Sequence, residues 1–142
     1  MNFIKNFFFV IFVALAMGGC ASEPKDKAED VAVAFFYAIY NQNDINKAQK
    51  LCTTNFAKQI SNYVTAKSVA RRLFNMSFDS VKIDAALGDL KVRDEFKSSG
   101  KLTILFTGHR QGKIYKELKS IKLIKKGDIW LIEKLLPDTI PN

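Results

Sequence analysis

The chain has 142 residues, of which 48% are hydrophobic and 25% are charged, and its formal net charge is +8. This composition is that of an ordinary globular protein and excludes a disordered or collagen-like chain, and the length suits one domain. The single histidine excludes a histidine-based metal site, and two cysteines do not make a thiolate zinc site. We therefore expect no metal and no other cofactor.

The first twenty residues have the layout of a secretory signal. Lys5 gives a positive start, residues 7–16 form an unbroken apolar run, and Gly18 and Gly19 precede Cys20. This run is too short to cross a bilayer, which requires about twenty residues. A buried helix of the folded domain is the alternative, but a run without a polar face would have to be covered on all sides.

The segment Met17-Gly18-Gly19-Cys20 resembles the lipobox, the cleavage site of bacterial lipoprotein signal peptides. The resemblance implies that residues 1–19 are removed, that Cys20 is acylated with fatty acids such as palmitate, and that residues 20–26 form a short tether to membrane lipid. Met17 departs from the leucine that the family usually carries. Because Ala21 follows the cysteine, the resemblance favours the outer membrane over the inner one, with the domain in the periplasm.

Cys52 is the second cysteine. Two cysteines in an exported chain can form one disulfide, but acylation of Cys20 would leave Cys52 alone. Cys52 ends a helical stretch, where a small buried apolar residue is the default, and no histidine or cationic pair stands beside it to lower its pKa. We expect an inert, packed thiol.

Residues 27–142 are expected to form one α+β domain that begins with helices. Apolar residues recur at helical spacing over residues 26–40, and Asp44 is placed to cap a second helix over residues 45–52. Thr53 or Thr54 would cap a third helix over about residues 55–74.

After Asn75 the apolar period changes from that of a helix to that of a strand. Alternation predicts strands over residues 81–84, 90–92, 102–107 and 115–124, with turns at 98–100, 111–112 and 125–128. Residues 129–132 are apolar on both faces, which indicates a central strand. Helices followed by strands with short turns predict an antiparallel sheet.

Four segments carry a family resemblance: the helix over residues 31–39, the polar break Asn43-Asp44, residues 46–51 and the closing residues 127–132. Their order resembles the nuclear transport factor 2-like, or cystatin-like, superfamily, in particular small bacterial lipoprotein domains related to lumazine-binding proteins. The resemblance implies N-terminal helices packed on a curved antiparallel sheet of about four strands, with a conical pocket. Members bind small molecules, catalyse reactions, or scaffold and dimerise, so the fold leaves the function open.

Three side chains are candidates for that pocket. Tyr115 and Glu117 share strand parity and would line the concavity if their side of the strand faces it, and His109 ends the preceding strand. The superfamily's enzymes often use Asp or Glu there, with Tyr or His. The alternative for Glu117 is pairing with lysines on a solvated face, and for His109 a solvated loop edge. We assign no catalytic residue.

Positive charge is concentrated near the C-terminus, where residues 97–142 carry ten basic and four acidic side chains. The candidate contacts to an anionic surface are Lys113, Lys116, Lys119, Lys122, Lys125 and Lys126. Since residues three apart in a strand point to opposite faces, we expect the lysines of the strand to be divided between its faces unless a bulge intervenes near Ser120. A simply solvated face is the alternative. Export and the lack of interleaved aromatic residues argue against nucleic acid.

The sequence thus predicts a non-enzymatic envelope lipoprotein that binds a ligand or a partner protein through a conical pocket or a basic sheet surface, with an anionic envelope component among the candidate partners. A small-molecule enzyme of the same fold and an assembly component of a secretion or conjugation apparatus are the alternatives. A homodimer becomes the better interpretation if Trp130 and Phe106 form an exposed apolar patch.

Overall fold

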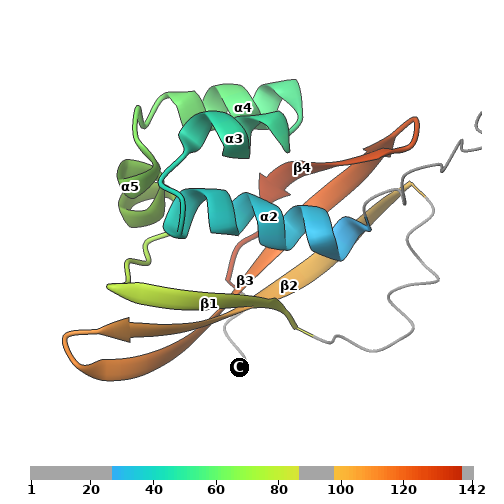
Figure 1. The fold of residues 1–142 in the computed structure, drawn as a ribbon. Coiled ribbons are helices and arrows are strands. Elements are labelled where there is room, and N and C mark those ends of the chain that lie inside the picture. The colour runs from blue at the N-terminus through green and yellow to red at the C-terminus, as the bar shows by residue number, and fades with distance from the viewer. Residues whose placement is uncertain (1–26, 87–97, 139–142) are drawn as a thin grey trace, which may run out of the picture.

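Helices cover one face of a four-stranded antiparallel sheet in the computed structural model (Figure 1), which describes residues 27–86 and 98–138. The helical layer contains α2 (Ala28–Tyr40), α3 (Ile45–Lys50), α4 (Thr54–Ser61), α5 (Ala66–Ser68) and a short π-helical turn, η2 (Val69–Leu73). The strands β1 (Ser80–Ala85), β2 (Ser99–Arg110), β3 (Lys113–Lys126) and β4 (Ile129–Leu135) lie side by side in chain order. The predicted α+β class and the antiparallel sheet of about four strands are confirmed.

Several predictions concern residues outside these ranges. The signal segment, Cys20, the tether and the predicted strand over residues 90–92 all lie outside the described residues. Within the described ranges, no helix combines the length and the apolar character needed to cross a bilayer.

The apolar stripe of α2 packs against the sheet and forms the centre of the core. Val31, Phe35, Phe36 and Ile39 recur at three- and four-residue spacing, so they share the face that meets the strands. The ring of Phe36 meets that of Phe106 in β2 edge to face, with 4.9 Å between centroids. Packed rings and aliphatic side chains therefore occupy the space between α2 and the sheet, and Phe106 and Trp130 are buried.

The predicted third helix over residues 55–74 is wrong, because the chain breaks at residues 62–65. The side chain of Thr53 caps α4 as expected, accepting from the Phe56 N–H. After α4, Val64 adopts a left-handed conformation with φ of 68°. The side chain of Thr65 then caps the N-terminus of α5 by accepting from the Ser68 N–H at 3.2 Å. A polar cap inside an apolar period thus divides the segment into α4, α5 and η2.

Two-residue turns join the long strands. Gln111 and Gly112 have φ of 51° and 73°, which is the left-handed pair that a type I′ hairpin requires between β2 and β3. Gly127, with φ of 60°, begins the turn between β3 and β4. The predicted turn at residues 98–100 is instead the start of β2, because Ser99 pairs with Ile124.

β4 lies at the edge of the sheet, which corrects the prediction of a central strand. Trp130 and Ile132 are buried toward the helices, whereas Ile129 on the other face is 64% exposed. The connection between α3 and α4 covers part of the outer edge: the Ile132 N–H donates to Leu51 O at 2.8 Å, and the Thr53 N–H donates to Ile132 O at 2.9 Å. β4 is therefore apolar on both faces although it is an edge strand, and a loop covers part of its edge.

Gly108 provides a test of the packing between β2 and the segment before β1. A Cβ atom at this position would stand 2.2 Å from the Phe78 ring. We expect Gly108→Ala to lower the free energy of unfolding by about 1–3 kcal/mol, the usual cost of overpacking, as measured by urea denaturation. Gly112→Ala is the matched control, with open space around it and only the strain of its positive φ. Equal stability of Gly108→Ala and the wild type would contradict the packing.

Candidate functional site

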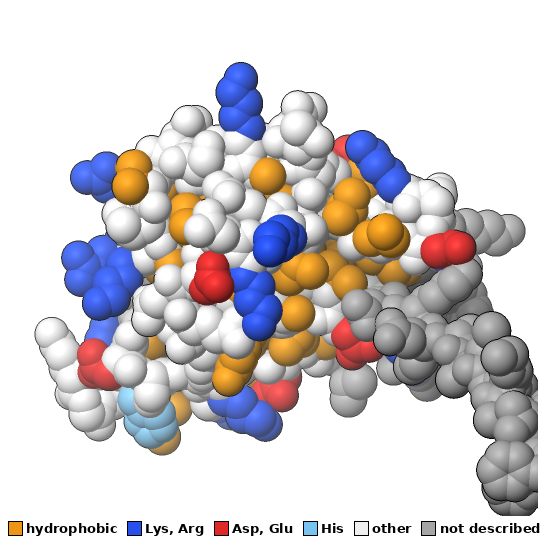
Figure 2. Space-filling model, turned by 45° about the horizontal axis from the view of Figure 1, so that its top comes forward, with side chains coloured by type: hydrophobic (Ala, Val, Ile, Leu, Met, Phe, Trp, Pro, Cys, Tyr) orange, Lys and Arg blue, Asp and Glu red, His pale blue; other side chains and the backbone are white. Residues whose placement is uncertain are grey.

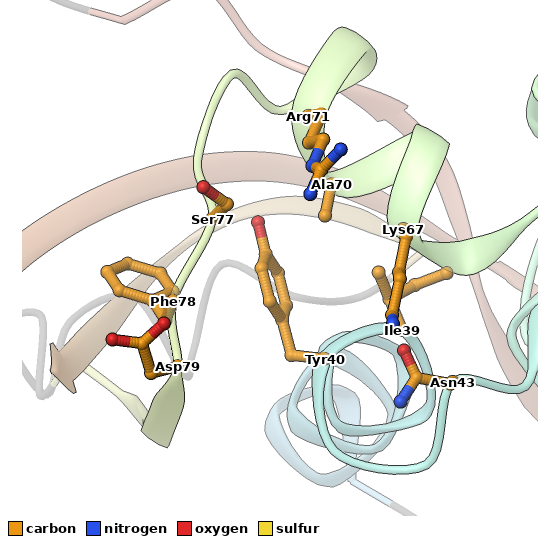
Figure 3. Close-up of a pocket in the computed structure, with 9 residues that line it drawn as sticks. All are labelled: Ile39, Tyr40, Asn43, Lys67, Ala70, Arg71, Ser77, Phe78 and Asp79. Carbon is orange, nitrogen blue, oxygen red and sulfur yellow. The ribbon is translucent and has the colours of Figure 1, made fainter. Parts of the chain in front are cut away.

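A pocket of about 350 Å³ lies on the helical side of the molecule, where α2 ends (Figure 3). Three segments form it: the end of α2 with the following loop, the turn from α5 to η2, and the segment leading into β1. The residues that line it are Ile39, Tyr40, Asn43, Lys67, Ala70, Arg71, Ser77, Phe78 and Asp79. Ile39 and Ala70 are buried, whereas Asn43, Lys67, Arg71 and Asp79 are exposed, so an apolar base meets a polar rim.

Tyr40 connects the walls of this pocket. Its hydroxyl donates to Met76 O at 3.1 Å, which fixes the segment before β1 against the end of α2. Burial raises the pKa of this phenol well above its ordinary value, so it remains a neutral donor at physiological pH. Its ring lies 5.8 Å from that of Phe78, and the Phe78 ring stacks over Phe106 at 6.4 Å. The pocket is therefore continuous with the aromatic core.

Asp79, which lines the pocket, is bonded to the β2–β3 hairpin. The carboxylate of Asp79 accepts from the Gln111 N–H at 2.9 Å, and the Asp79 N–H donates to His109 O at 2.7 Å. The first bond engages the one carboxylate among the described lining residues with the hairpin, and the second joins the Asp79 backbone to the same hairpin. Asp79 therefore acts as a structural anchor in this structure.

Lys67 and Arg71 give the rim its positive charge. They stand four residues apart across the turn from α5 to η2, and both side chains lie on the pocket side in Figure 3. Neither forms a salt bridge with another described residue. η2 has π-type geometry, with the Phe74 N–H donating to Val69 O, and such turns are frequent at functional sites. Two cations beside an apolar base favour a ligand with an anionic group and an apolar body.

The three side chains expected to line a pocket do not converge. Tyr115 and Glu117 pair with Gly108 and Phe106, so they stand on the helical face of β3, as the parity argument required. Arg110 covers the Tyr115 ring at 4.2 Å, and Glu117 is exposed. His109 is exposed. It stands on the opposite face of the sheet, because successive residues of a strand point to opposite faces and its neighbour Gly108 is on the helical face.

The six candidate lysines are divided between the two faces of the sheet, as predicted for the four that recur every three residues. Lys125 and Lys126, which were expected in a turn, instead end β3. Lys119 is buried and its ammonium lies 2.6 Å from the Asp138 carboxylate, so it serves the fold. Lys122 pairs with Glu133 at 2.7 Å, and the Lys125 ammonium lies 5.8 Å from the Trp130 ring centre. The remaining three are exposed: Lys113, Lys116 and Lys126.

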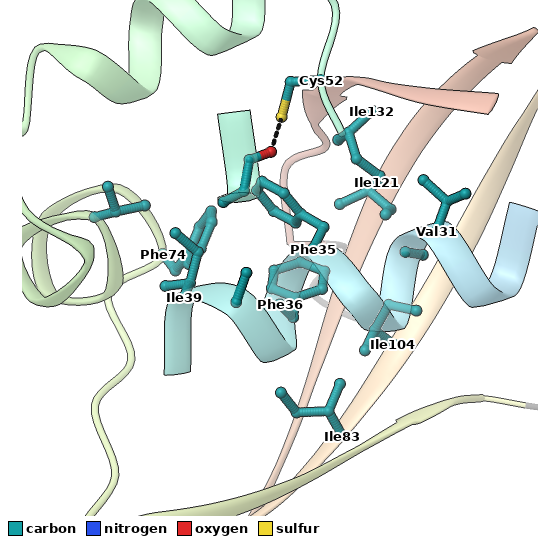
Figure 4. Close-up of a cluster of buried hydrophobic side chains, with 14 of the residues drawn as sticks. Val31, Phe35, Phe36, Ile39, Cys52, Phe74, Ile83, Ile104, Ile121 and Ile132 are labelled. Carbon is teal, nitrogen blue, oxygen red and sulfur yellow. Dashed lines mark hydrogen bonds between the residues drawn. The ribbon is translucent and has the colours of Figure 1, made fainter. Parts of the chain in front are cut away.

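Cys52 is packed as the sequence predicts. It is 7% exposed, and its Sγ donates to Ala48 O at 3.3 Å (Figure 4). Burial raises the pKa of the thiol from 9.0 to about 12, which keeps it protonated and poorly nucleophilic. Among the described residues, no group of three histidine, cysteine or acidic side chains is arranged to hold a metal ion.

The pocket residues are not apparent from the sequence, because the apolar period predicts one long helix where the chain forms α4, α5 and η2. The spacing of Lys67 and Arg71 was the available signal, since residues four apart share a helix face. No protein-family model matches the chain, and the comparison with curated proteins gave no match either.

The raised pKa of Cys52 predicts a loss of stability in alkali. The unfolded thiol ionises above its ordinary pKa of 9.0, whereas the folded thiol stays neutral up to about pH 12. This contribution to stability is therefore complete below pH 9 and falls between pH 9 and 12, by at most about 1.4 kcal/mol per pH unit. Cys52→Ala should show a shallower alkaline decline in urea denaturation. Tyr40 titrates in both proteins, so parallel curves would refute the assignment to Cys52.

Proposed function

We propose that this protein is a lipid-anchored, non-enzymatic binding protein of the bacterial cell envelope that holds a small organic anion in the pocket beside α2. The observation that carries the proposal is the pair Lys67 and Arg71, which stands over an apolar base without a carboxylate partner among the described residues. A cationic side chain without an ion-pair partner can donate charge-assisted hydrogen bonds to a carboxylate or a phosphate. The buried Ile39 and Ala70 would take the apolar part of the same ligand.

The titratable groups support binding rather than catalysis. General acid–base chemistry needs a group that titrates near neutral pH and reaches the substrate. In the pocket, Tyr40 is held neutral by burial, and Asp79 is engaged by the Gln111 N–H. His109 stands on the opposite face of the sheet, and the Cys52 thiol is buried. The ligand would therefore be held by charge and apolar contact.

The anchor is proposed from the sequence of residues 17–20 and its resemblance to the lipobox. Each CH₂ group of an acyl chain buried in the bilayer contributes about 0.8 kcal/mol, so more than one chain gives stable attachment. The residues from 21 to 26 can extend about 20 Å at most, which would keep the pocket near the bilayer. The helix-on-sheet architecture agrees with the cystatin-like resemblance.

Acylation can be tested in a bacterial host grown with a clickable fatty acid. We expect the wild-type chain to incorporate the label and to lose residues 1–19, as measured by intact-mass spectrometry of the extracted protein. Cys20→Ala should lose both the label and the cleavage. Cys52→Ala is the matched control and should retain both, because the Cys52 thiol is buried. An unmodified thiol at Cys20 with the leader still attached would sink the anchoring proposal.

The pocket can be tested with anilinonaphthalene sulfonate, a fluorescent probe that combines an anionic sulfonate with apolar rings. We expect Arg71→Gln and Lys67→Gln each to weaken probe binding by about tenfold, because a charge-assisted hydrogen bond contributes about 1.5–3 kcal/mol. Lys47→Gln and Lys58→Gln, on exposed positions of α3 and α4, are the matched controls. If all four variants bind the probe alike, the pocket is not the anion site.

A further inference from the structure

The face of the sheet that points away from the helices has a distinct chemical character. We call it the outer face, and define it by the residues that alternate with the buried positions of each strand. Its members include Lys82, Asp84, Lys101, Thr103, Leu105, Thr107, His109, Ile114, Lys116, Leu118, Ser120, Lys122, Ile124, Lys126, Ile129, Leu131 and Lys134. It holds six lysines, whereas the acids in or beside it are Asp84 and Glu133.

Three of these lysines stand in one row across the sheet. Lys101 pairs with Lys122 between β2 and β3, and Lys122 pairs with Lys134 between β3 and β4. Like charges directly opposite each other destabilise a sheet. Glu133, displaced by the irregular register after Lys122, neutralises one of the three through its 2.7 Å contact with Lys122. Electrostatic repulsion between lysines therefore remains in this row, and it does not stabilise the fold.

Most of the positive charge on the outer face has no counterion within residues 27–86 and 98–138. Asp84 pairs with Lys82 at 3.2 Å, and Glu133 pairs with Lys122. The other four outer-face lysines have no salt bridge with any residue of the described ranges: Lys101, Lys116, Lys126 and Lys134. Figure 2 shows the helical side, where basic side chains are spread over the surface. An array of lysines without counterions among the described residues is complementary to a negatively charged surface.

Large aliphatic side chains stand among these lysines. Ile114 and Ile129 are each 64% exposed, and Leu118 is 56% exposed. Leu118 lies opposite Leu105, and Ile124 lies opposite Leu131, so apolar pairs flank the lysine row. Apolar residues among basic ones are the composition of surfaces that lie in the interfacial layer of a membrane.

We propose that the outer face of the sheet rests on a bilayer containing anionic lipid, with the lysine row against the headgroups and Leu118, Ile114 and Ile129 at the acyl boundary. This orientation turns the pocket beside α2 away from the membrane, since the pocket lies on the helical side. Acylation at Cys20, which belongs to the proposed function, would add to this contact, because the tether can reach the same bilayer. The contact itself requires only the described face.

The same observations disfavour two other occupants. A second copy of the chain packed face to face would bring two lysine rows together, which adds repulsion to the repulsion already present. Single-stranded nucleic acid is bound by aromatic side chains that stack with bases, and the described outer face carries no phenylalanine, tyrosine or tryptophan. A lipid surface uses both the charge and the exposed aliphatic groups.

The test uses the full-length chain reconstituted in vesicles of phosphatidylcholine, with or without phosphatidylglycerol. A polarity-sensitive dye is attached through Leu118→Cys on the outer face or, in the matched control, through Lys58→Cys on α4. We expect the emission of the Leu118 label to shift to the blue with phosphatidylglycerol, and the Lys58 label to stay unchanged. A shift of the Lys58 label alone would overturn the proposal, because the helical side would then face the membrane.

The lysine row is tested by Lys101→Gln combined with Lys134→Gln. We expect affinity for phosphatidylglycerol vesicles to fall about 25-fold, since each lysine near an anionic bilayer contributes roughly fivefold. The variant should fold at least as well as the wild type, because it removes a like-charge repulsion. Lys47→Gln combined with Lys58→Gln is the control of equal charge and should bind nearly as the wild type does. Equal losses of vesicle affinity in the two double variants would refute binding through the outer face.

Two readouts separate the failures of the two proposals. Flotation with pure phosphatidylcholine vesicles reports the acyl anchor, whereas the added response to phosphatidylglycerol reports the outer face. A chain that floats only with anionic vesicles lacks the anchor and still supports the face. A Leu118 label that responds to protein concentration but not to lipid would overturn the proposal in favour of a dimer.

Discussion

The contact on which the structure depends is the set of aromatic rings around Phe36. Its centroid lies 5.0 Å from that of Phe35, 5.3 Å from that of Phe74 and 4.9 Å from that of Phe106. These rings come from α2, the end of η2 and β2, so one residue joins the central helix, the last helical turn and the sheet. Edge-to-face pairs contribute about 0.5–1.5 kcal/mol each beyond their buried area, which orients α2 on the strands.

This packing also decides where a ligand can bind. The family resemblance places a cone between helices and sheet, but fully buried phenylalanine and aliphatic side chains occupy that space. The cavity lies instead where the aromatic packing ends, at Tyr40 and Phe78. The rim there takes its charge from exposed residues of α5 and η2. The pocket and the core packing therefore share Phe78, whose ring lies over Gly108.

The sequence predicted those elements whose signals are local. The apolar stripe of α2, the cap at Asp44 and the turn at Gln111-Gly112 each depend on a few neighbouring residues, and the structure has all three. The break after α4 is not visible in the sequence, because the helical spacing of apolar residues continues through it. Thr65, within that spacing, caps the start of α5. The pocket was missed because its walls come from segments far apart in the chain, whose meeting depends on the bond from Tyr40 to Met76 O. The parity of β3 was available from sequence, but what covers each face was not.

The loop that pairs with β4 has a consequence for crowded conditions. An open strand edge offers unpaired N–H and C=O groups to any neighbouring chain, and so serves as a template for aggregation. Here Leu51 and Thr53 engage both backbone groups of Ile132, at the midpoint of the most apolar strand. At the opposite edge of the sheet, the Asn41 amide donates to Val81 O at 3.1 Å. At each edge of the sheet, part of the backbone is thus bonded within the chain and unavailable to a neighbouring molecule. This matters most where many molecules of the protein are confined to a small area.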